Sequence, residues 1–165
     1  MLTPELIPVF EATIQLGDVQ SVSDSRRIVQ VVGGQFSGPN FQAKVLAGGG
    51  DWQVIHADGR VEIDTRYTLE TPEGSLIYLQ NTGMRLGTYM RTVSTFEVQD
   101  PAYTWLTESL FISTGKKEGD VVSHVFYRSS YITRIFTSDK SCRPSRLKIK
   151  STGNAIDVHD FASKK

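Results

Sequence analysis

Cysteine is nearly missing from this sequence, because Cys142 is the single one among 165 residues. A lone thiol excludes an internal disulfide and any zinc site built from a cysteine cluster. An excess of one charge is missing too, since 18 Lys and Arg balance 18 Asp and Glu. Nucleic-acid binders are usually basic, because phosphate neutralisation supplies much of their affinity. The charge balance therefore argues against that class of protein.

Targeting and catalytic motifs are also absent. The stretch "MLTPELIPVFEATIQLG" has neither a basic region nor a sustained apolar run, so we expect no signal peptide and a soluble, cytoplasmic protein. The sequence contains no G-x-S-x-G elbow, no Walker lysine and no dinucleotide fingerprint. The histidines are isolated from one another and predict no metal site: His56, His124 and His159.

Short alternating segments separated by turn signals make up most of the chain, which indicates β-strands. Asp58-Gly59 predicts a type I′ hairpin turn. The segment "DPAYTWLTESL", with Asp100 as N-cap and Pro101 after it, predicts one short helix or 3₁₀ turn near residues 100–109. Many short strands and few helices favour an all-β domain, either a sandwich or a single antiparallel β-barrel of the lipocalin type. We predict the barrel, because closure removes edge strands.

The composition changes after Arg128. Residues 129–165 are richer in Lys, Arg and Ser and show little alternation. We expect one domain over residues 1–165, with 129–165 as a C-terminal extension. This extension is an extra strand or two, a disordered tail, or a segment that docks on a partner subunit.

The strand predicted over residues 61–70 has two different faces. Alternation directs one set of side chains to one face, namely Val61, Ile63, Thr65, Tyr67 and Leu69, and the other set to the opposite face, namely Glu62, Asp64, Arg66, Thr68 and Glu70. If the charged face is exposed, Asp64 and Arg66 form a surface pair of little energetic value. If it lines the lumen of a barrel, Arg66 binds an anion and Asp64 orients its guanidinium.

Asp51-Trp52, which follows the glycine triplet 48–50, has two interpretations. In the structural one, the glycines form a bend, Asp51 caps backbone N–H groups and Trp52 closes a barrel end. In the functional one, Asp51 is a general base whose pKa is raised by desolvation, and Trp52 stacks on a ligand. Tyr89 and Arg91 share a face of "TYMRT", where Arg91 either reaches solvent or is buried with a partner.

Several motifs together resemble the DUF3237 family, also called UPF0311. They are "GGQFSGP", "VLAGGGDW", "DG", "DTRY", "GSLIY", "MRT", "YTWL" and "FISTG", and the similarity covers about residues 5–127. Ala47, Pro72-Glu73 and the length of the chain after Arg128 depart from the family pattern. The resemblance implies a compact β-barrel and is compatible with a cofactor-free isomerase or cyclase acting on aromatic, polyketide-type molecules. The positions that match the family motifs are Asp51, Trp52, Asp64, Arg66, Tyr67, Tyr78, Arg91, Tyr103 and Trp105.

We therefore predict an acid–base site without metal or cofactor that takes a small aromatic or phenolic ligand. Its predicted catalytic residues are Asp51, Asp64, Arg66 and Arg91, and its predicted ligand-binding residues are Trp52, Tyr67, Tyr78, Tyr89, Tyr103 and Trp105. Two alternatives stay open: a carrier barrel without chemistry, and a structural or assembly protein with a filled lumen. A homodimer is compatible with all three, and we expect no nucleic-acid or membrane partner.

Overall fold

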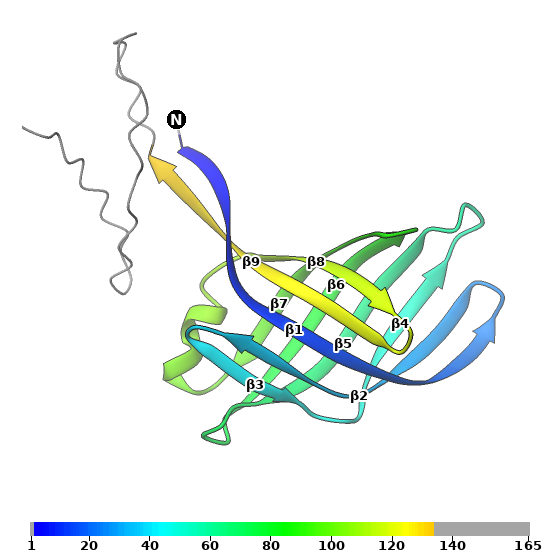
Figure 1. Cartoon of the computed structure of the whole chain (residues 1–165), viewed down its shortest axis with the longest axis horizontal. Helices are drawn as coiled ribbons and strands as arrows, with labels where there is room; N and C mark the ends of the chain where they lie inside the picture. The colour runs from blue at the N-terminus through cyan, green and yellow to red at the C-terminus, as the bar shows by residue number, and fades with distance from the viewer. Residues whose placement is uncertain (1, 134–165) are drawn as a thin grey trace, which may run out of the picture. The chain divides into compact units, whose positions relative to one another are not determined.

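The computed structural model describes residues 2–133, which form a β-barrel with one short helix (Figure 1). The elements in chain order are β1 (Leu2–Ser23), β2 (Arg26–Gly38), β3 (Phe41–Val45), β4 (Gly49–Ile55), β5 (Val61–Glu70), β6 (Leu76–Leu86), β7 (Tyr89–Val98), the 3₁₀ helix η1 (Pro101–Leu106), β8 (Phe111–Glu118) and β9 (Val121–Thr133). Among residues 2–133, no helix has both the length and the apolar character needed to cross a membrane.

The nine strands form one antiparallel sheet that closes on itself. From β5 to β9 each strand pairs with the next, and β9 returns to pair with β1, which pairs with β2. The strands β3 and β4 share one position between β2 and β5, because β2 pairs with β4 through residues 26–31 and with β3 through residues 34–38. The predicted antiparallel barrel is confirmed.

Two glycines explain why one strand position is divided between β3 and β4. Gly48 has a φ of +106°, a conformation that side chains disfavour, and it redirects the chain between the two strands. Gly49 lies so close to β5 that a Cβ on it would come within 2.6 Å of the Arg66 carbonyl oxygen. The structural interpretation of the triplet as a bend is therefore correct for Gly48, whereas Gly49 is required for close packing of β4 on β5.

The helix η1 follows the predicted capping pattern. The Asp100 side chain accepts a hydrogen bond of 2.9 Å from the backbone N–H of Ala102, and Pro101 occupies the first turn. The predicted type I′ turn at Asp58-Gly59 is wrong, because the Gly59 N–H donates to the His56 carbonyl and the His56 N–H donates to Arg60. This pattern makes a three-residue loop in which Gly59, at a φ of +82°, occupies the left-handed position.

One end of the lumen is filled by aromatic side chains. The Phe10 ring centroid lies 4.9–6.4 Å from those of six others, and together the cluster comprises Phe10, Phe36, Phe41, Phe96, Trp105, Phe111 and Phe126. Such pairs add about 0.5–1.5 kcal/mol each beyond the burial of their area. Leu106 of η1 is buried against the same cluster. This end of the barrel is therefore a packed core.

The start of the predicted C-terminal extension belongs to strand β9. Residues 129–133 continue β9 and pair with the first residues of β1, from Leu6↔Ser129 to Leu2↔Thr133. The rest of the extension, residues 134–165 with Cys142 and His159, lies outside the described residues.

Candidate functional site

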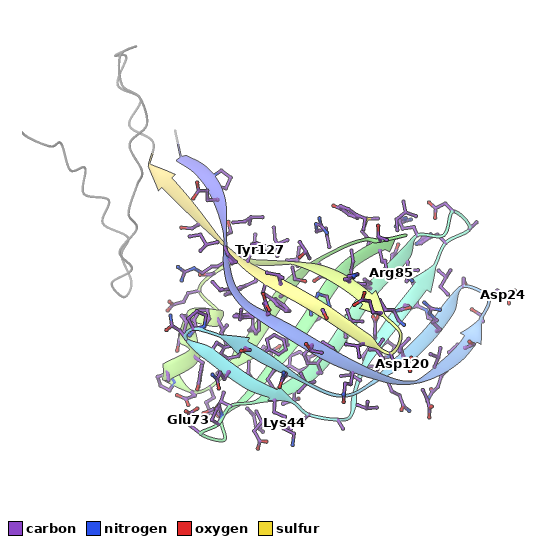
Figure 2. All side chains as sticks on the ribbon, viewed as in Figure 1. Asp24, Lys44, Glu73, Arg85, Asp120 and Tyr127 are labelled. Atoms are coloured by element: carbon purple, nitrogen blue, oxygen red, sulfur yellow. The ribbon has the colours of Figure 1, made fainter. Side chains whose placement is uncertain are left out.

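The other half of the lumen holds a cavity of about 340 Å³. Its outermost lining residues are Arg27, Arg85, Lys117 and Asp120, which lie at or next to strand ends near the β1–β2, β6–β7 and β8–β9 connections. Figure 2 shows Arg85 and Asp120 toward the end of the barrel where Asp24 lies, away from Glu73. Because the lumen is hollow here, this part of the barrel does not match the filled interior expected of a purely structural protein.

The walls of the cavity are mixed in character. Strand alternation turns every second side chain inward, and the apolar part of the lining comes from five strands: Ile14, Val29, Ile63, Met90 and Val122. The polar part that lies further from the mouth consists of Asp51, Gln53, Thr65, Tyr67, Asn81, Thr92 and His124. An apolar cavity with a few converging polar groups is typical of small-molecule sites, and its volume lies in their usual range.

Asp51 places a carboxyl group in this cavity. Gln53 Nε2 donates to its Oδ2, and the backbone N–H of Asp64 donates to its Oδ1 at 3.2 Å. Burial nevertheless raises the pKa of Asp51, because desolvation of the carboxylate outweighs these hydrogen bonds. Gln53 in turn accepts a hydrogen bond of 2.7 Å from Arg27 Nε, so the amide links Asp51 to a guanidinium.

Tyr67 and Asn81 form a second polar group. Asn81 accepts a hydrogen bond of 2.5 Å from the Ser94 hydroxyl, and its amide donates to the Tyr67 hydroxyl at 3.4 Å. Burial raises the pKa of Tyr67 far above its ordinary value, so the phenol is protonated at neutral pH. Because Asn81 is the donor of this pair, the phenolic hydrogen of Tyr67 can be donated to a ligand.

His124 forms a third polar group on the inward face of β9. Its Nδ1 lies 3.0 Å from the Ser113 hydroxyl, which lies 2.6 Å from the Thr92 hydroxyl. Burial lowers the pKa of His124 to about 4, so the imidazole is neutral at physiological pH. Within residues 2–133, no three His, Cys, Asp or Glu side chains come close enough together to hold a metal ion.

The expectation that Asp64 and Arg66 face the lumen is wrong. Their side chains lie on the outer surface of β5, where Arg66 Nε and Nη2 donate to the two Asp64 carboxylate oxygens at 3.0 and 2.7 Å. Trp52 is 38% exposed, and the Arg66 guanidinium carbon lies 5.6 Å from the centre of its ring. The physical reason is that the apolar face of β5, which includes Tyr67, is the one that the barrel buries.

The remaining predicted residues are also outside the cavity. Arg91 is on the outer face of β7, with its guanidinium 4.5 Å from the Tyr89 ring, and Tyr78 faces outward on β6. Tyr103 and Trp105 lie at the packed end, where the Tyr103 hydroxyl donates to Glu73 at 2.8 Å and Trp105 packs on the aromatic cluster. The predicted pocket with two arginines and stacked aromatic walls does not form.

Of the ten predicted site residues, two therefore line the cavity, Asp51 and Tyr67. Sequence reasoning missed several others, since it treated His124 as solitary and did not consider Arg27, Gln53 or Asn81. The signal available for Arg27, Asn81 and His124 was strand alternation, because they share the inward faces of their strands with the buried Val29, Leu79 and Phe126. Gln53 shares its inward face with Asp51.

Comparison with known proteins gives consistent matches. The model of a family described as "Protein of unknown function (DUF3237)" matches residues 4–88. A UPF0311 protein from Rhodopseudomonas palustris strain TIE-1 is 32% identical to this chain, and the match covers 69% of this chain and 89% of that protein.

Solved structures with the same fold include one called a β-barrel-like protein and one called an enzyme. A β-barrel-like protein from Acinetobacter baumannii AYE (ABAYE2633) matches with a TM-score of 0.73 and 30% identity, over 78% of this chain and 97% of that chain. An enzyme from Penicillium herquei matches with a TM-score of 0.62 and 22% identity, over 78% of this chain and 95% of that chain, which shows a shared fold alone.

Proposed function

This chain belongs to the DUF3237 family, and from that premise and its own cavity we propose that it is a cofactor-independent isomerase or intramolecular cyclase. Its substrate is a small aromatic or phenolic molecule held in the lumen, and Asp51 is the acid–base group. The observation that carries the proposal is the buried Asp51 carboxyl, which lines the cavity and has a raised pKa. A carboxyl group whose pKa is raised toward neutrality is suited to both accept and return a proton.

The contrast between two neighbouring carboxyl groups supports this assignment. Hydrogen bonds from the Arg66 guanidinium hold the pKa of Asp64 below its ordinary value, and Asp64 is on the outer surface. Burial raises the pKa of Asp51 on the adjacent strand. Carboxyl groups whose pKa values are moved in opposite directions by their surroundings have different chemical roles. Asp51, and not Asp64, is the candidate base.

The cavity also offers an electrophilic partner for the base. The protonated Tyr67 hydroxyl can donate to a ligand carbonyl oxygen, and its position on β5 is two residues from Thr65, which pairs with Asp51. A preorganised donor that stabilises an enolate contributes roughly 3 kcal/mol to a transition state. Tyr67 therefore takes the place of Arg66 and Arg91, which were predicted as catalytic residues but lie outside the cavity.

One reaction of this class is the closure of a phenol onto an enone in the same molecule. Asp51 takes the phenolic proton, the phenol oxygen forms a C–O bond at the β-carbon, and the alkene electrons move to the carbonyl oxygen as an enolate stabilised by Tyr67. The α-carbon of the enolate then recovers the proton from Asp51. No atom or electron is gained or lost, so no cofactor is needed for this reaction.

The test uses 2′-hydroxychalcone, whose cyclisation to flavanone is followed by the loss of its absorbance. We expect the wild-type chain to accelerate this cyclisation, and D51N to reduce turnover by about 10²–10⁴-fold. Ligand binding, measured by a thermal-shift titration, should change much less. The matched control is D64N, which makes the same substitution on the outer surface and should keep both the turnover and the ligand binding of the wild type.

Two outcomes would contradict the proposal. Equal turnover by D51N and D64N would remove Asp51 from the chemistry, provided that circular dichroism shows both variants folded. Binding of phenolic ligands by the wild-type chain without conversion of any would favour the carrier function, which the same cavity with its apolar walls also suits.

A further inference from the structure

Three cationic residues occupy the inward face at the outer end of the cavity. Arg27 pairs across strands with Gln53, Arg85 with Met90, and Lys117 with Val122. Residues directly opposite each other in an antiparallel pair lie on the same face of the sheet. Because Gln53, Met90 and Val122 are buried and line the cavity, the three cations also point to the inner side of the barrel wall.

Three cations on the outer surface pair with carboxylates, whereas Arg91, which is also on the outside, contacts the Tyr89 ring instead. On the outside, Arg66 pairs with Asp64, Arg60 with Glu62, and Lys116 with Glu118 at 2.6 Å. Among the described residues, none of the three inward cations has a carboxylate within 4.0 Å. The contrast is sharpest on β8, where the outward Lys116 is paired and its inward neighbour Lys117 reaches only the Gly119 carbonyl.

Three cationic and two acidic side chains line the cavity, so the lining is net positive even when both carboxyl groups are ionised. The acidic residues of the lining are Asp51, which lies deeper and binds Gln53, and the exposed Asp120. Charges of one sign at the mouth of a cavity with apolar walls focus the electrostatic field and raise the local concentration of counter-ions. Arg85 is half-buried, and its planar guanidinium suits a group with two anionic oxygens.

We propose that the ligand of this cavity is an organic anion, whose charged group binds Arg85 together with Arg27 and Lys117 at the mouth. This inference rests on the proposed function, since it names the substrate class of the same site. The anionic group lies at the mouth, a flat apolar body packs on Ile63 and Met90, and an oxygen at the far end reaches Tyr67. A carboxylate and a phosphate monoester share the required chemistry.

The test compares three ligands with the same two-ring body: 2-naphthoate, 2-naphthyl phosphate and the neutral 2-naphthamide. Isothermal titration calorimetry on the full chain should show at least one of the two anions binding about tenfold or more tightly than the amide. The tighter of the two identifies the anionic group. Raising the NaCl concentration from 20 to 300 mM should weaken binding of that anion and leave the amide little changed.

Substitutions locate the binding site of the anion. R85Q should weaken binding of the preferred anion by about tenfold and leave the amide unchanged, because it removes a charge from the mouth and little of the apolar wall. K117Q removes a charge at a second strand end and should likewise weaken binding of the preferred anion and leave the amide unchanged. R91Q is the matched control, since it removes an arginine of the neighbouring strand that lies on the outer face, and it should bind all three ligands like the wild type.

The outcomes separate this inference from the proposed function. Amide binding that equals or exceeds that of both anions overturns the inference, as does failure of both anions to bind. Equal effects of R85Q and R91Q also overturn it. In each of these cases the cyclisation assay with D51N still decides the role of Asp51, because 2′-hydroxychalcone is neutral. If the wild-type chain itself does not accelerate the cyclisation while its selectivity for the anion is intact, the protein is an anion carrier.

Discussion

His124 gives a prediction whose magnitude follows from the structure. Its imidazole is 9% exposed on the inner face of β9, and burial lowers its pKa from 6.5 to about 4. The folded state therefore binds fewer protons than the unfolded state between these two values. The free energy of unfolding must fall as the pH decreases through this interval, because protons stabilise the unfolded chain.

The size of the effect follows from the pKa difference. A lowering from 6.5 to about 4 corresponds to about 3 kcal/mol of unfolding free energy. Most of this free energy, on the order of 2–3 kcal/mol, is lost between pH 7.5 and pH 4.5. His124→Gln keeps a hydrogen-bonding side chain and removes the titration, so its deficit in stability relative to the wild type should shrink by this amount over the same interval.

The assay is urea unfolding followed by tryptophan fluorescence at several pH values from 7.5 to 4.5. Other groups titrate in both proteins and largely cancel in the difference. Ser113→Ala is the control, because it removes the hydroxyl that contacts His124 and keeps the imidazole buried. It should lower stability by about 1 kcal/mol and keep the pH dependence of the wild type. A difference between His124→Gln and wild type that stays constant with pH would refute the reasoning.

Three further perturbations have defined outcomes. Burial raises the pKa of Asp51, so the stability that this group contributes is present below its unfolded pKa and is lost as the pH rises through its folded pKa. Urea unfolding should therefore show that the free energy of unfolding of D51N increases relative to that of the wild type as the pH rises from 4 to 8. Arg66→Ala should leave both ligand binding and the urea midpoint nearly unchanged, because its ion pair with Asp64 is exposed. A large loss of ligand affinity in a thermal-shift titration would instead show that Arg66 belongs to the binding site. Gly49→Ala should destabilise by about 1–3 kcal/mol in urea unfolding, since its Cβ meets β5, and a neutral result would show that the strands can separate there.

The sequence by itself determined the architecture and much of its local detail. Alternation in segments such as residues 61–70 marked the strands, and Asp100 with Pro101 marked the helix η1. These signals are local, because strand alternation and helix capping depend on neighbours within a few residues. The family motifs, including the "GGGDW" block, were also readable in the sequence, and they placed Asp51 among the candidates.

Only the tertiary structure decided which polar residues meet. Arg27, Arg85 and Lys117 come from three strands far apart in the sequence, and they line one cavity because β9 pairs with β1 and closes the barrel. The position of the packed aromatic cluster decided that one end of the lumen is filled and the other is hollow. Such long-range register has no signature in any single segment. For this reason the sequence supplied the inward-facing residues, and the closure of the barrel selected those that share a cavity.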